Sequence, residues 1–481
     1  MDMLSRRRKL IILVSCCLSL LIVSMDATIV NVAIPSIRTE LGASASQLQW
    51  VIDIYTLVLA SLLLLSGATA DRFGRRRVFQ VGLTVFAAGS LLCSLAPNIH
   101  TLVAARFLQA IGGSMLNPVA MSIITQVFTG RVERARAVGV WGAVVGISMA
   151  LGPIVGGALI EFVGWRSVFW INLPICAAAI LLTAIFVPES RSTTMRDIDP
   201  IGQGLAVAFL FAVVFVLIQG REMGWTSAPT LLISAIAVAA FGAFLRYEAR
   251  RRDPFIDLQF FRSVPFASAT MIAVCAFAIY GAFLFMMSLY LQGERHYSAV
   301  HTGLLYLPIA GSSLVFAPLS GRLVGRFGAR PSLLVAGVMI TSATLLLTRL
   351  TATTHVLALI GMFAVFGIGF AMVNAPITTA AVSGMPTDRA GAASAVASTS
   401  RQVGVSIGVA LCGSLAGAAL SATGADFAAA SRTLWFVAAV LGVAITALAV
   451  GSTSRPAIRS AERLAPLIGR PEHREASARA A

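Results

Sequence analysis

The stretch LSLLIVSMDATIVNVAIPSI, residues 18–37, decides the fold class of this chain. It reads as the middle of an apolar helix, yet it contains a carboxylate, Asp26, and an amide, Asn31. An acid at the centre of a bilayer span costs about 3 kcal/mol even on the lenient insertion scales. Either this stretch is not a membrane span, or Asp26 has a function at that position.

Composition favours a membrane protein. The chain has 481 residues, of which 58% are hydrophobic and 12% are charged, and its mean hydropathy is +0.87. A soluble protein carries about 25% charged residues. The charges are clustered, which leaves uncharged intervals such as residues 107–130 and 138–160. Because a span needs about 20 apolar residues, these intervals predict a polytopic, all-α integral membrane protein.

Counting the intervals predicts about fourteen transmembrane helices. Their approximate ranges are 10–34, 47–70, 78–97, 101–128, 137–160, 167–188, 201–220, 226–245, 266–291, 302–321, 331–350, 355–380, 391–418 and 432–453. The seventh and eighth are the least certain, although residues 201–220 contain no charge. The alternative is twelve spans, with that region as a cytoplasmic linker.

The basic residues predict the orientation in the membrane. Of the 36 Lys and Arg residues, 28 lie in the termini and in the loops expected on the same side as the termini. Two, Arg106 and Arg401, fall well inside predicted spans, away from their ends. Positively charged loops stay in the cytoplasm, so both termini are expected there. The same distribution accounts for the net charge of +16, and no nucleic-acid partner is expected. The six on the opposite side are Arg38, Arg166, Arg221, Arg295, Arg349 and Arg432.

Two segments of the first half recur in the second half. SGATADRFGRRR (66–77) aligns with SGRLVGRFGARP (320–331), and GGSMLNP (112–118) aligns with GFAMVNAP (369–376), at offsets of 254 and 257. Both copies of the first segment belong to predicted cytoplasmic loops. The nearly shared offset indicates a duplicated half in parallel repeat, which is common in transporters.

Six segments, in the expected order, make the chain similar to the major facilitator superfamily, in its 14-span drug:proton antiporter branch. The resemblance implies two six-helix bundles, 1–190 and 263–454, with two additional transmembrane helices and linkers in 191–262 and a basic cytoplasmic tail at 455–481. It also implies a monomer in the plasma membrane. The segments are MDATIVNVAIP (25–35), GATADRFGRRR (67–77), LVAARFLQAIGGS (102–114), GISMALGPIVGG (146–157), WRSVFWINLPI (165–175) and GAASAVASTSRQVGVSIGVAL (391–411).

Proton coupling is expected at the acids within the spans, Asp26 and Asp53. Burial raises a carboxyl pKa and a nearby cation lowers it, so an acid that exchanges an Arg partner for water or substrate can take up and release a proton. In the resembling family, the first-helix acid and the fourth-helix Arg face the central cavity. Asp26 is therefore the expected proton site, with Arg106 as its modulator and Asn31 nearby. A permanent structural ion pair is the alternative. Asp53 lies nearer the extracellular end, where contact with water is its alternative.

Two further motifs predict conformational roles. In the loop after the second helix, Gly67, Asp71, Arg72 and Gly74 are expected to form a switch that locks one access state, as the family resemblance implies. For Arg75 to Arg77, membrane topology alone is the favoured interpretation. The fifth-helix motif is expected to kink and to prevent leakage, with ordinary helix packing as its alternative. Its residues are Gly146, Gly152, Pro153, Gly156 and Gly157.

Enzymatic interpretations fail on residue grounds. A nucleotide-hydrolysing P-loop needs its Lys, and Lys9 is the only lysine. Gly404-Val-Ser406-Ile-Gly408 matches a nucleophile-elbow pattern but lies in an apolar helical run, where small-residue helix packing explains it. His296 and His301 share a loop without a Cys or acid array, so no metal site and no cofactor are expected.

The substrate is expected to be a small lipophilic molecule, exported in exchange for protons. An apolar and aromatic set on the predicted cavity helices suits such cargo, although most of its members fit a core or lipid-facing position equally well. The 35 Arg against one Lys indicate a GC-rich bacterium, where antibiotic exporters of this kind occur. Export of an endogenous metabolite, lipid or siderophore is the alternative. The cavity candidates are Gln109, Met115, Asn117, Trp141, Tyr280, Tyr306, Asn374 and Arg401, together with Phe277 and Phe283.

Overall fold

The computed structural model describes residues 5–190, 199–251, 256–382, 390–421 and 427–468. These residues are almost entirely helical and contain no β-strand. The chain divides into two compact units. Unit 1 comprises Met1–Ile198 and Ser288–Ala310, and unit 2 comprises Asp199–Met287 and Gly311–Ala481.

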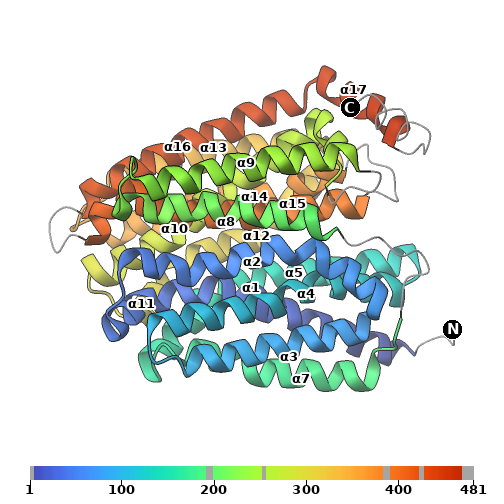
Figure 1. The fold of residues 1–481 in the computed structure, drawn as a ribbon, viewed down its shortest axis with the longest axis horizontal. Helices are drawn as coiled ribbons and strands as arrows, with labels where there is room; N and C mark the ends of the chain where they lie inside the picture. Colours follow the sequence, from blue (N-terminus) through green and yellow to red (C-terminus); the bar gives the residue numbers. More distant parts are fainter. Residues whose placement is uncertain (1–4, 191–198, 252–255, 383–389, 422–426, 469–481) are drawn as a thin grey trace. The chain divides into compact units, whose positions relative to one another are not determined.

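Unit 1 is built from long helices that run side by side (Figure 1). Local sequence signals set their ends. Ser44 and Gln47 form a capping box at the start of α2, and Asn98 and Thr101 form another at the start of α4; such boxes satisfy backbone donors that a helix start leaves open. Gly42 ends α1 in the left-handed conformation. The helices are α1 (Arg6–Leu41), α2 (Ala45–Phe73), α3 (Arg75–Ser94), α4 (Ile99–Val127), α5 (Arg131–Phe162), α6 (Ser167–Trp170), α7 (Asn172–Phe186), η2 (Tyr290–Glu294) and α11 (Ala299–Leu305).

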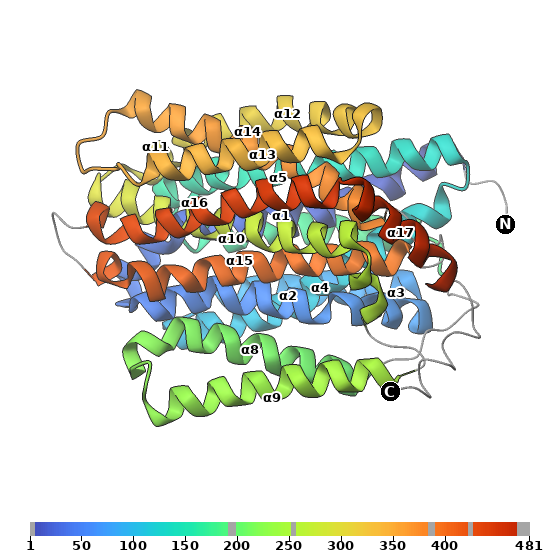
Figure 2. The same cartoon turned by 90° about the horizontal axis from the view of Figure 1, so that it is seen from above.

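Unit 2 begins with a helical hairpin of α8 and α9, which lie side by side in both views (Figures 1 and 2). Asp199 caps α8 immediately before Pro200, and Ser227 caps α9. Proline suits the first turn of a helix because no partner is needed there for its missing N–H. The helices are α8 (Pro200–Met223), α9 (Ala228–Arg250), η1 (Leu258–Arg262), α10 (Val264–Leu289), α12 (Leu307–Phe327), α13 (Ala329–Leu347), α14 (Val356–Val382), α15 (Ala390–Ser421), α16 (Phe427–Ser452) and α17 (Arg455–Ile468).

Twelve of the fourteen predicted spans match helices that are long and apolar enough to cross a membrane, among the described residues. The other two, 137–160 and 391–418, lie within the helices α5 and α15, of 32 residues each, which are not among these twelve. The count of fourteen stays a prediction. The regions of α8 and α9 both belong to the twelve, which argues against a linker at this place. The prediction of an all-helical membrane protein is confirmed.

Small residues allow the helices to approach closely in both units. In unit 2, a Cβ atom added at Gly404 would lie 2.6 Å from the Val274 carbonyl oxygen, and one at Gly408 would lie 1.9 Å from that of Ala278. The glycines of α15 therefore press directly on the backbone of α10, as small residues do between membrane helices. The Gly-x-Ser-x-Gly pattern is thus a helix-packing motif here.

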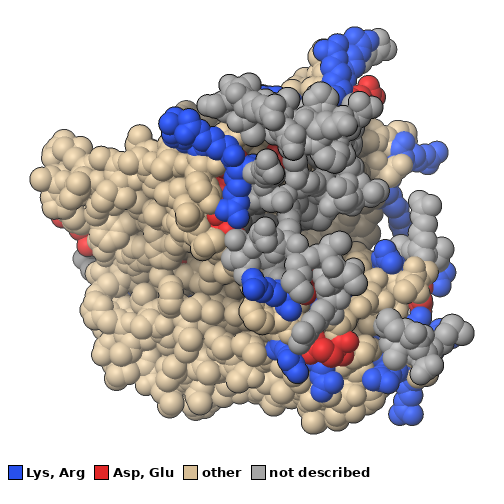
Figure 3. All heavy atoms as spheres, turned by 45° about the vertical axis from the view of Figure 1, so that its right-hand side comes forward, with Lys and Arg blue, Asp and Glu red and all other residues tan. Residues whose placement is uncertain are grey.

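Basic residues gather at one end of unit 1. Arg8 Nε donates to the Phe186 carbonyl at 3.0 Å, and Lys9 Nζ lies 3.0 Å from a Glu133 carboxylate oxygen. The start of α1, the start of α5 and the end of α7 are therefore neighbours. In the view of Figure 3, the Lys and Arg side chains lie toward one side, and the rest of the visible surface carries few charges. This segregation suits helices whose sides contact lipid and whose ends contact water.

Candidate functional site

A buried ion pair joins α1 to α4 in unit 1. Arg106 Nη1 donates to Asp26 Oδ2, and the two side chains are only 1% and 0% exposed. The sequence predicted both residues as functional, and the structure brings them into direct contact. Removing one partner of such a pair costs about 3–5 kcal/mol, because the other charge stays buried without compensation.

Two amide side chains complete the coordination of Asp26. Gln109 Nε2 donates to Asp26 Oδ1 at 2.8 Å, and Asn172 Nδ2 donates to the same oxygen at 3.1 Å. Both amides also donate to the Ser90 hydroxyl, at 2.7 and 3.2 Å. The Gln109 carbonyl oxygen in turn accepts from Arg106 Nη1 at 2.7 Å. We call these five residues the Asp26 cluster; its members come from α1, α3, α4 and α7.

Arg106 is held on its other side by backbone and aromatic rings. Its Nε donates to the Val51 carbonyl at 3.2 Å. Its guanidinium carbon lies 4.1 Å from the centroid of the Tyr55 ring and 5.8 Å from that of Phe169. A cation over an aromatic face is attracted by the electrons of the ring. The guanidinium is therefore fixed in orientation, and the cluster as a whole is electrically neutral.

Glycines in α3 and α4 make the cluster possible. A Cβ atom at Gly89 would lie 2.5 Å from the Cα and from the backbone nitrogen of Gln109, and one at Gly112 would lie 2.3 Å from the Phe86 nitrogen. Only a residue without a side chain permits this approach. Ser90, next to Gly89, reaches Gln109 for the same reason. Ser90 and Asn172 were not predicted from the sequence; for Ser90 the neighbouring Gly89 is the available signal.

Replacing Gly89 is expected to separate α3 from α4. In Gly89→Val, the new side chain would overlap the backbone at Gln109, and overpacking of this kind costs about 1–3 kcal/mol. We expect a lower thermal unfolding temperature for the purified protein and weaker transport. Gly139→Val in α5 is the control, because nothing lies within 4 Å of a Cβ atom at that position. Equal unfolding temperatures for the two variants would contradict this role of Gly89.

The fifth-helix motif packs tightly against α1, just after Asp26. A Cβ atom at Gly152 would lie 2.0 Å from Thr28 Oγ1, and one at Gly156 would lie 2.5 Å from Ile29 Cγ1. The motif is thus closely packed, while its kink and its leak-preventing role stay predictions. The surroundings of Gly146 lie outside what the structure describes.

The opposite face of the motif packs against α11. A Cβ atom at Gly157 would lie 2.4 Å from the Ala299 carbonyl oxygen, and one at Gly303 would lie 2.5 Å from that of Pro153. One turn further along α5, Glu161 Oε2 accepts from the Val300 backbone nitrogen at 2.9 Å. The motif therefore makes backbone-level contacts on both sides, and a movement of α5 must disturb α1.

The predicted switch loop is held by contacts within unit 1. Arg75 Nη2 lies 2.9 Å from Asp71 Oδ1, and its Nη1 donates to Gln126 Oε1 at 3.1 Å. Gly74 has a φ of +109°, and a Cβ atom there would lie 2.6 Å from Glu189 Oε1. Glycine is therefore required by both conformation and space. Gly67 is less restricted, since the nearest atom to its Cβ position is Pro118 Cβ at 3.9 Å.

The arginines after the loop have specific partners in the structure, and the interpretation that they serve membrane topology alone stays a prediction. Besides the pairing of Arg75, Arg76 Nη2 donates to the Ala184 carbonyl at 2.6 Å, and its backbone nitrogen donates to Glu189 Oε1 at 3.2 Å. Arg77 Nε lies 3.7 Å from Glu189 Oε2. Glu189, which the sequence did not single out, thus holds the start of α3.

Asn31 and Asp53, the other polar span residues predicted in unit 1, are both buried. Asp53 is 0% exposed, so the expected alternative of contact with water is wrong in this conformation. Asn31 Nδ2 donates within its own helix, to the carbonyls of Ala27 and Thr28 at 3.2 and 3.4 Å. Its role stays a prediction.

The cavity candidates divide between the units. In unit 1, Gln109 belongs to the Asp26 cluster, and the buried Tyr306 shares a hydrogen bond of 3.2 Å with Ser288. Met115, Asn117 and Trp141 are half-buried. Among the described residues, the Asn117 carbonyl oxygen and the Trp141 indole nitrogen have no hydrogen-bond partner, and their role stays a prediction.

In unit 2, the aromatic candidates form a stack. Tyr280 lies parallel to Phe370 with ring centroids 4.1 Å apart, and Phe283 lies parallel to Phe366 at 4.2 Å. Phe283 is fully buried and is a core residue. Phe277 packs edge-on against Phe370.

The polar candidates of unit 2 lie on two neighbouring helices. The half-buried Asn374 lies on α14, and Arg401 on α15. Arg401 Nη2 donates to Thr378 Oγ1 at 2.6 Å. Its guanidinium carbon lies 5.9 Å from the centroid of the Phe277 ring. Whether these residues bind substrate stays a prediction.

The long apolar helices, with a neutral buried polar cluster inside the first unit, define a polytopic membrane transport protein. The particular family is shown by its sequence model, described as Major Facilitator Superfamily, which matches residues 16–409. The chain belongs to this superfamily. The resemblance noted from the sequence motifs is thereby confirmed.

Similar proteins include exporters and resistance proteins of bacteria. The chain is 37% identical over 418 residues to the multidrug resistance protein Stp of Mycobacterium tuberculosis, covering 87% of this chain and 78% of that protein. It is 35% identical to the tetracenomycin C resistance and export protein of Streptomyces glaucescens, covering 84% and 75%. It is also 35% identical to a methylenomycin A resistance protein of Streptomyces coelicolor, covering 81% and 82%.

A solved structure shares the fold. It is a bacterial homologue of the human lysosomal transporter Spinster in an inward-facing and unoccupied conformation. The TM-score is 0.59 at 17% identity, and the match covers 99% of this chain and 98% of the other. At this identity the similarity concerns the fold alone.

Proposed function

We propose that the protein is a secondary active exporter that moves small lipophilic drugs or antibiotics out of a bacterial cell in exchange for protons. The observation that carries the proposal is the Asp26 cluster, in which a buried carboxylate accepts hydrogen bonds from Arg106, Gln109 and Asn172. An ionisable group inside a membrane span marks an ion or substrate pathway by default. The names of the similar proteins support antibiotics as cargo.

The geometry supports a simple coupling scheme. In this conformation the Asp26 carboxylate is buried and fully ligated, so a proton from water reaches it only after the cluster opens. Protonation then removes the negative charge that holds Arg106, and deprotonation restores it. Because α5 packs on α1 beside Asp26 through Gly152 and Gly156, a rearrangement of α1 is transmitted to the fifth-helix motif. Antiport needs this coupling between proton exchange and helix movement.

A panel of drug susceptibilities tests the cargo. The gene is expressed in an efflux-deficient bacterium, and growth-inhibiting concentrations are compared with an empty vector for neutral, monocationic and dicationic compounds. We expect a rise of at least about fourfold, which is roughly 0.8 kcal/mol in an equivalent equilibrium, for several lipophilic neutral or monocationic compounds. If well-expressed protein protects against none, an endogenous metabolite, lipid or siderophore becomes the favoured cargo.

The orientation is tested by labelling single cysteines with a membrane-impermeant maleimide. Thr226 lies in the turn between α8 and α9 and is exposed. We expect Thr226→Cys to react in intact cells, and Ser192→Cys to react only after permeabilisation, because the distribution of basic residues predicts a cytoplasmic position for the termini and the 191–198 segment. Protection of Thr226→Cys in intact cells would instead favour twelve spans.

A further inference from the structure

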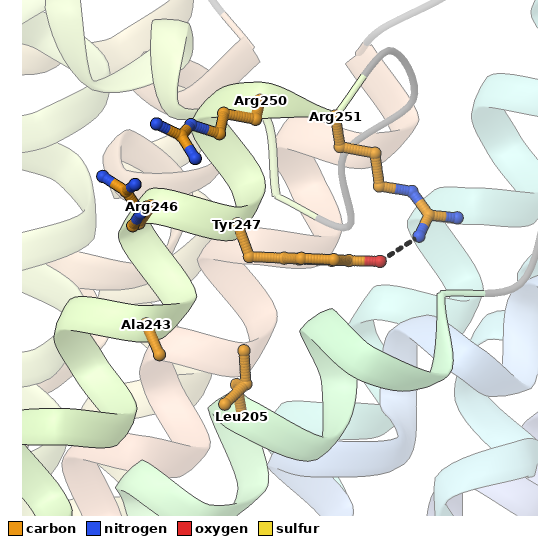
Figure 4. A pocket seen from close by; sticks show the side chains of 6 residues that line it. All are labelled: Leu205, Ala243, Arg246, Tyr247, Arg250 and Arg251. Carbon is orange, nitrogen blue, oxygen red and sulfur yellow. Dashed lines mark hydrogen bonds between the residues drawn. The ribbon is translucent and has the colours of Figure 1, made fainter. Parts of the chain in front are cut away.

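A basic pocket lies between α8 and α9 in unit 2, at the end of the hairpin where α9 terminates. Its volume is about 440 Å³. Leu205 of α8 and Ala243 of α9 form its apolar part (Figure 4). The other lining residues are Arg246, Tyr247, Arg250 and Arg251. Side chains of three arginines therefore line one pocket at the end of two apolar helices.

One of these arginines already has a protein partner. Arg251 Nη1 lies 2.9 Å from Asp199 Oδ1 and also donates to the Tyr247 hydroxyl. The Tyr247 hydroxyl lies 3.1 Å from the same oxygen of Asp199. Asp199 is the cap of α8 and accepts from the Gly202 backbone nitrogen at 2.9 Å. These contacts connect the end of α9 to the start of α8, so the side of the pocket at Tyr247 and Arg251 is held in position.

The other two arginines present their charge to the surroundings. Arg246 and Arg250 lie one turn apart on α9, and both are exposed. Figure 4 shows their guanidinium groups next to each other, while that of Arg251 is directed away from them. Within the described part of the chain, neither has a hydrogen bond or ion pair. Asp253 lies outside the described residues.

The nearby buried acid does not neutralise this pair. Glu248, between them in the sequence, is buried and accepts from the Ile256 backbone nitrogen at 3.1 Å. Two like charges one turn apart destabilise a helix. An anion between Arg246 and Arg250 would reverse this repulsion and gain charge-assisted hydrogen bonds. The arrangement therefore suits a phosphate group.

The neighbouring surface indicates what carries the phosphate. Large apolar side chains are exposed along the hairpin next to the pocket, at Ile201, Phe241 and Leu245. Both helices are long and apolar enough to cross a membrane, so these side chains face acyl chains. A soluble anion gains nothing from such a surface, whereas a phospholipid places its headgroup at the arginines and its chains along the apolar side.

We infer that the pocket binds an anionic phospholipid of the leaflet at this end of the helices, with its phosphodiester between Arg246 and Arg250 and an acyl chain against Leu205 and Ala243. Basic pockets between membrane helices bind anionic headgroups in this way. The positive charges assign this end to the cytoplasm, and the lipid site does not depend on that assignment or on the transported cargo.

The test measures lipid binding to the full chain in detergent by native mass spectrometry. Phosphatidylglycerol and phosphatidylcholine are titrated separately. Each basic residue near the surface contributes about 1 kcal/mol to anionic lipid binding, or about fivefold in affinity. We therefore expect Arg246→Gln/Arg250→Gln to bind phosphatidylglycerol at least about tenfold more weakly, with binding of phosphatidylcholine unchanged.

The control removes an equal charge at an equal spacing. Arg322 and Arg326 lie one turn apart on α12 and are exposed, so Arg322→Gln/Arg326→Gln is expected to keep its phosphatidylglycerol affinity. Ala243→Trp fills the apolar part without changing the charge and is expected to weaken binding as well. Folding of all variants is checked by the thermal unfolding temperature.

Two results would overturn the inference. The first is an equal phosphatidylglycerol affinity of the parent and the Arg246→Gln/Arg250→Gln variant. The second is a pair of observations: millimolar inorganic phosphate or glycerol phosphate displaces the lipid, and the Ala243→Trp variant binds phosphatidylglycerol as tightly as the parent. Together these would identify a site for a free anion.

Discussion

Asp26→Asn is expected to abolish proton-driven export while the protein remains inserted in the membrane. The asparagine keeps the shape of the side chain but neither binds nor releases a proton in the physiological range. The measurement is uphill transport in inverted vesicles with an imposed pH gradient. We expect transport to fall to the level of vesicles without the protein, and gradient-independent binding of substrate to persist.

The Asp26→Asn variant needs a second variant as its control, because Asp26 is paired with Arg106 in the structure. Loss of a buried charge alone would lower a desolvation penalty, but Asp26 is paired with Arg106, so Asp26→Asn leaves a buried guanidinium without its counterion. The double variant Asp26→Asn/Arg106→Gln removes both charges. We expect it to be more stable than Asp26→Asn and still inactive, which separates loss of coupling from loss of folding.

Asp26→Glu provides the conservative variant. It retains the ionisable group but moves the carboxyl by one methylene, so the hydrogen bonds from Gln109 and Asn172 must lengthen or shift. Partial, gradient-dependent transport is expected. Gradient-dependent transport at the level of the parent by well-expressed Asp26→Asn would refute the assignment, and the buried Asp53 would then be the next candidate.

The helices were largely predictable because the physical signal is strong. A run of about 20 uncharged, apolar residues has few alternatives to a membrane helix, and the charges between the runs fall in the loops. The structure extends several helices beyond the predicted spans, so that charges between the runs lie at helix ends as well as in loops: α1 covers Arg6–Leu41 where 10–34 was expected. The hydropathy of the sequence indicates only the part of α1 that lies in lipid. The helix itself continues beyond that part until Gly42 ends it.

The ion pair itself was predictable, but its surroundings were not. A charge in an apolar run is conspicuous, so Asp26 and Arg106 stand out. Ser90 and Asn172 are neutral, and neutral polar residues are common in membrane helices, so nothing in their own positions marks them. Their contacts depend on α3 and α7 approaching α1 and α4. That approach is decided by tertiary packing at glycines such as Gly89.

The basic loop shows a second limit of sequence reasoning. A run of arginines after a membrane helix is explained by topology, and this explanation conceals specific contacts. The pairing of Arg75 with Asp71 follows from an i, i+4 spacing, which is visible in the sequence. The contacts of Arg76 with Ala184 and Glu189 bridge more than a hundred residues of sequence, and only the fold reveals them.

Arg106→Lys is expected to stop transport almost as completely as removal of the side chain, although it keeps the positive charge. The guanidinium donates simultaneously to Asp26, Gln109 and the Val51 carbonyl. An ammonium group is a compact point charge without the planar fork that these three acceptors require. Lysine therefore leaves at least one buried acceptor without its donor, at about 1–3 kcal/mol each.

The measurement compares transport and stability for Arg106→Lys, Arg106→Ala and Arg349→Lys, the last being an exposed position outside the spans. We expect Arg349→Lys to match the parent, and Arg106→Ala to be the least stable, because it leaves Asp26 as an uncompensated buried charge. Arg106→Lys is expected to insert and to bind substrate but to lose gradient-driven transport by about tenfold or more, which corresponds to about 1.4 kcal/mol. Full activity of Arg106→Lys would show that only the charge matters. The geometry of the hydrogen bonds would then have no part in coupling.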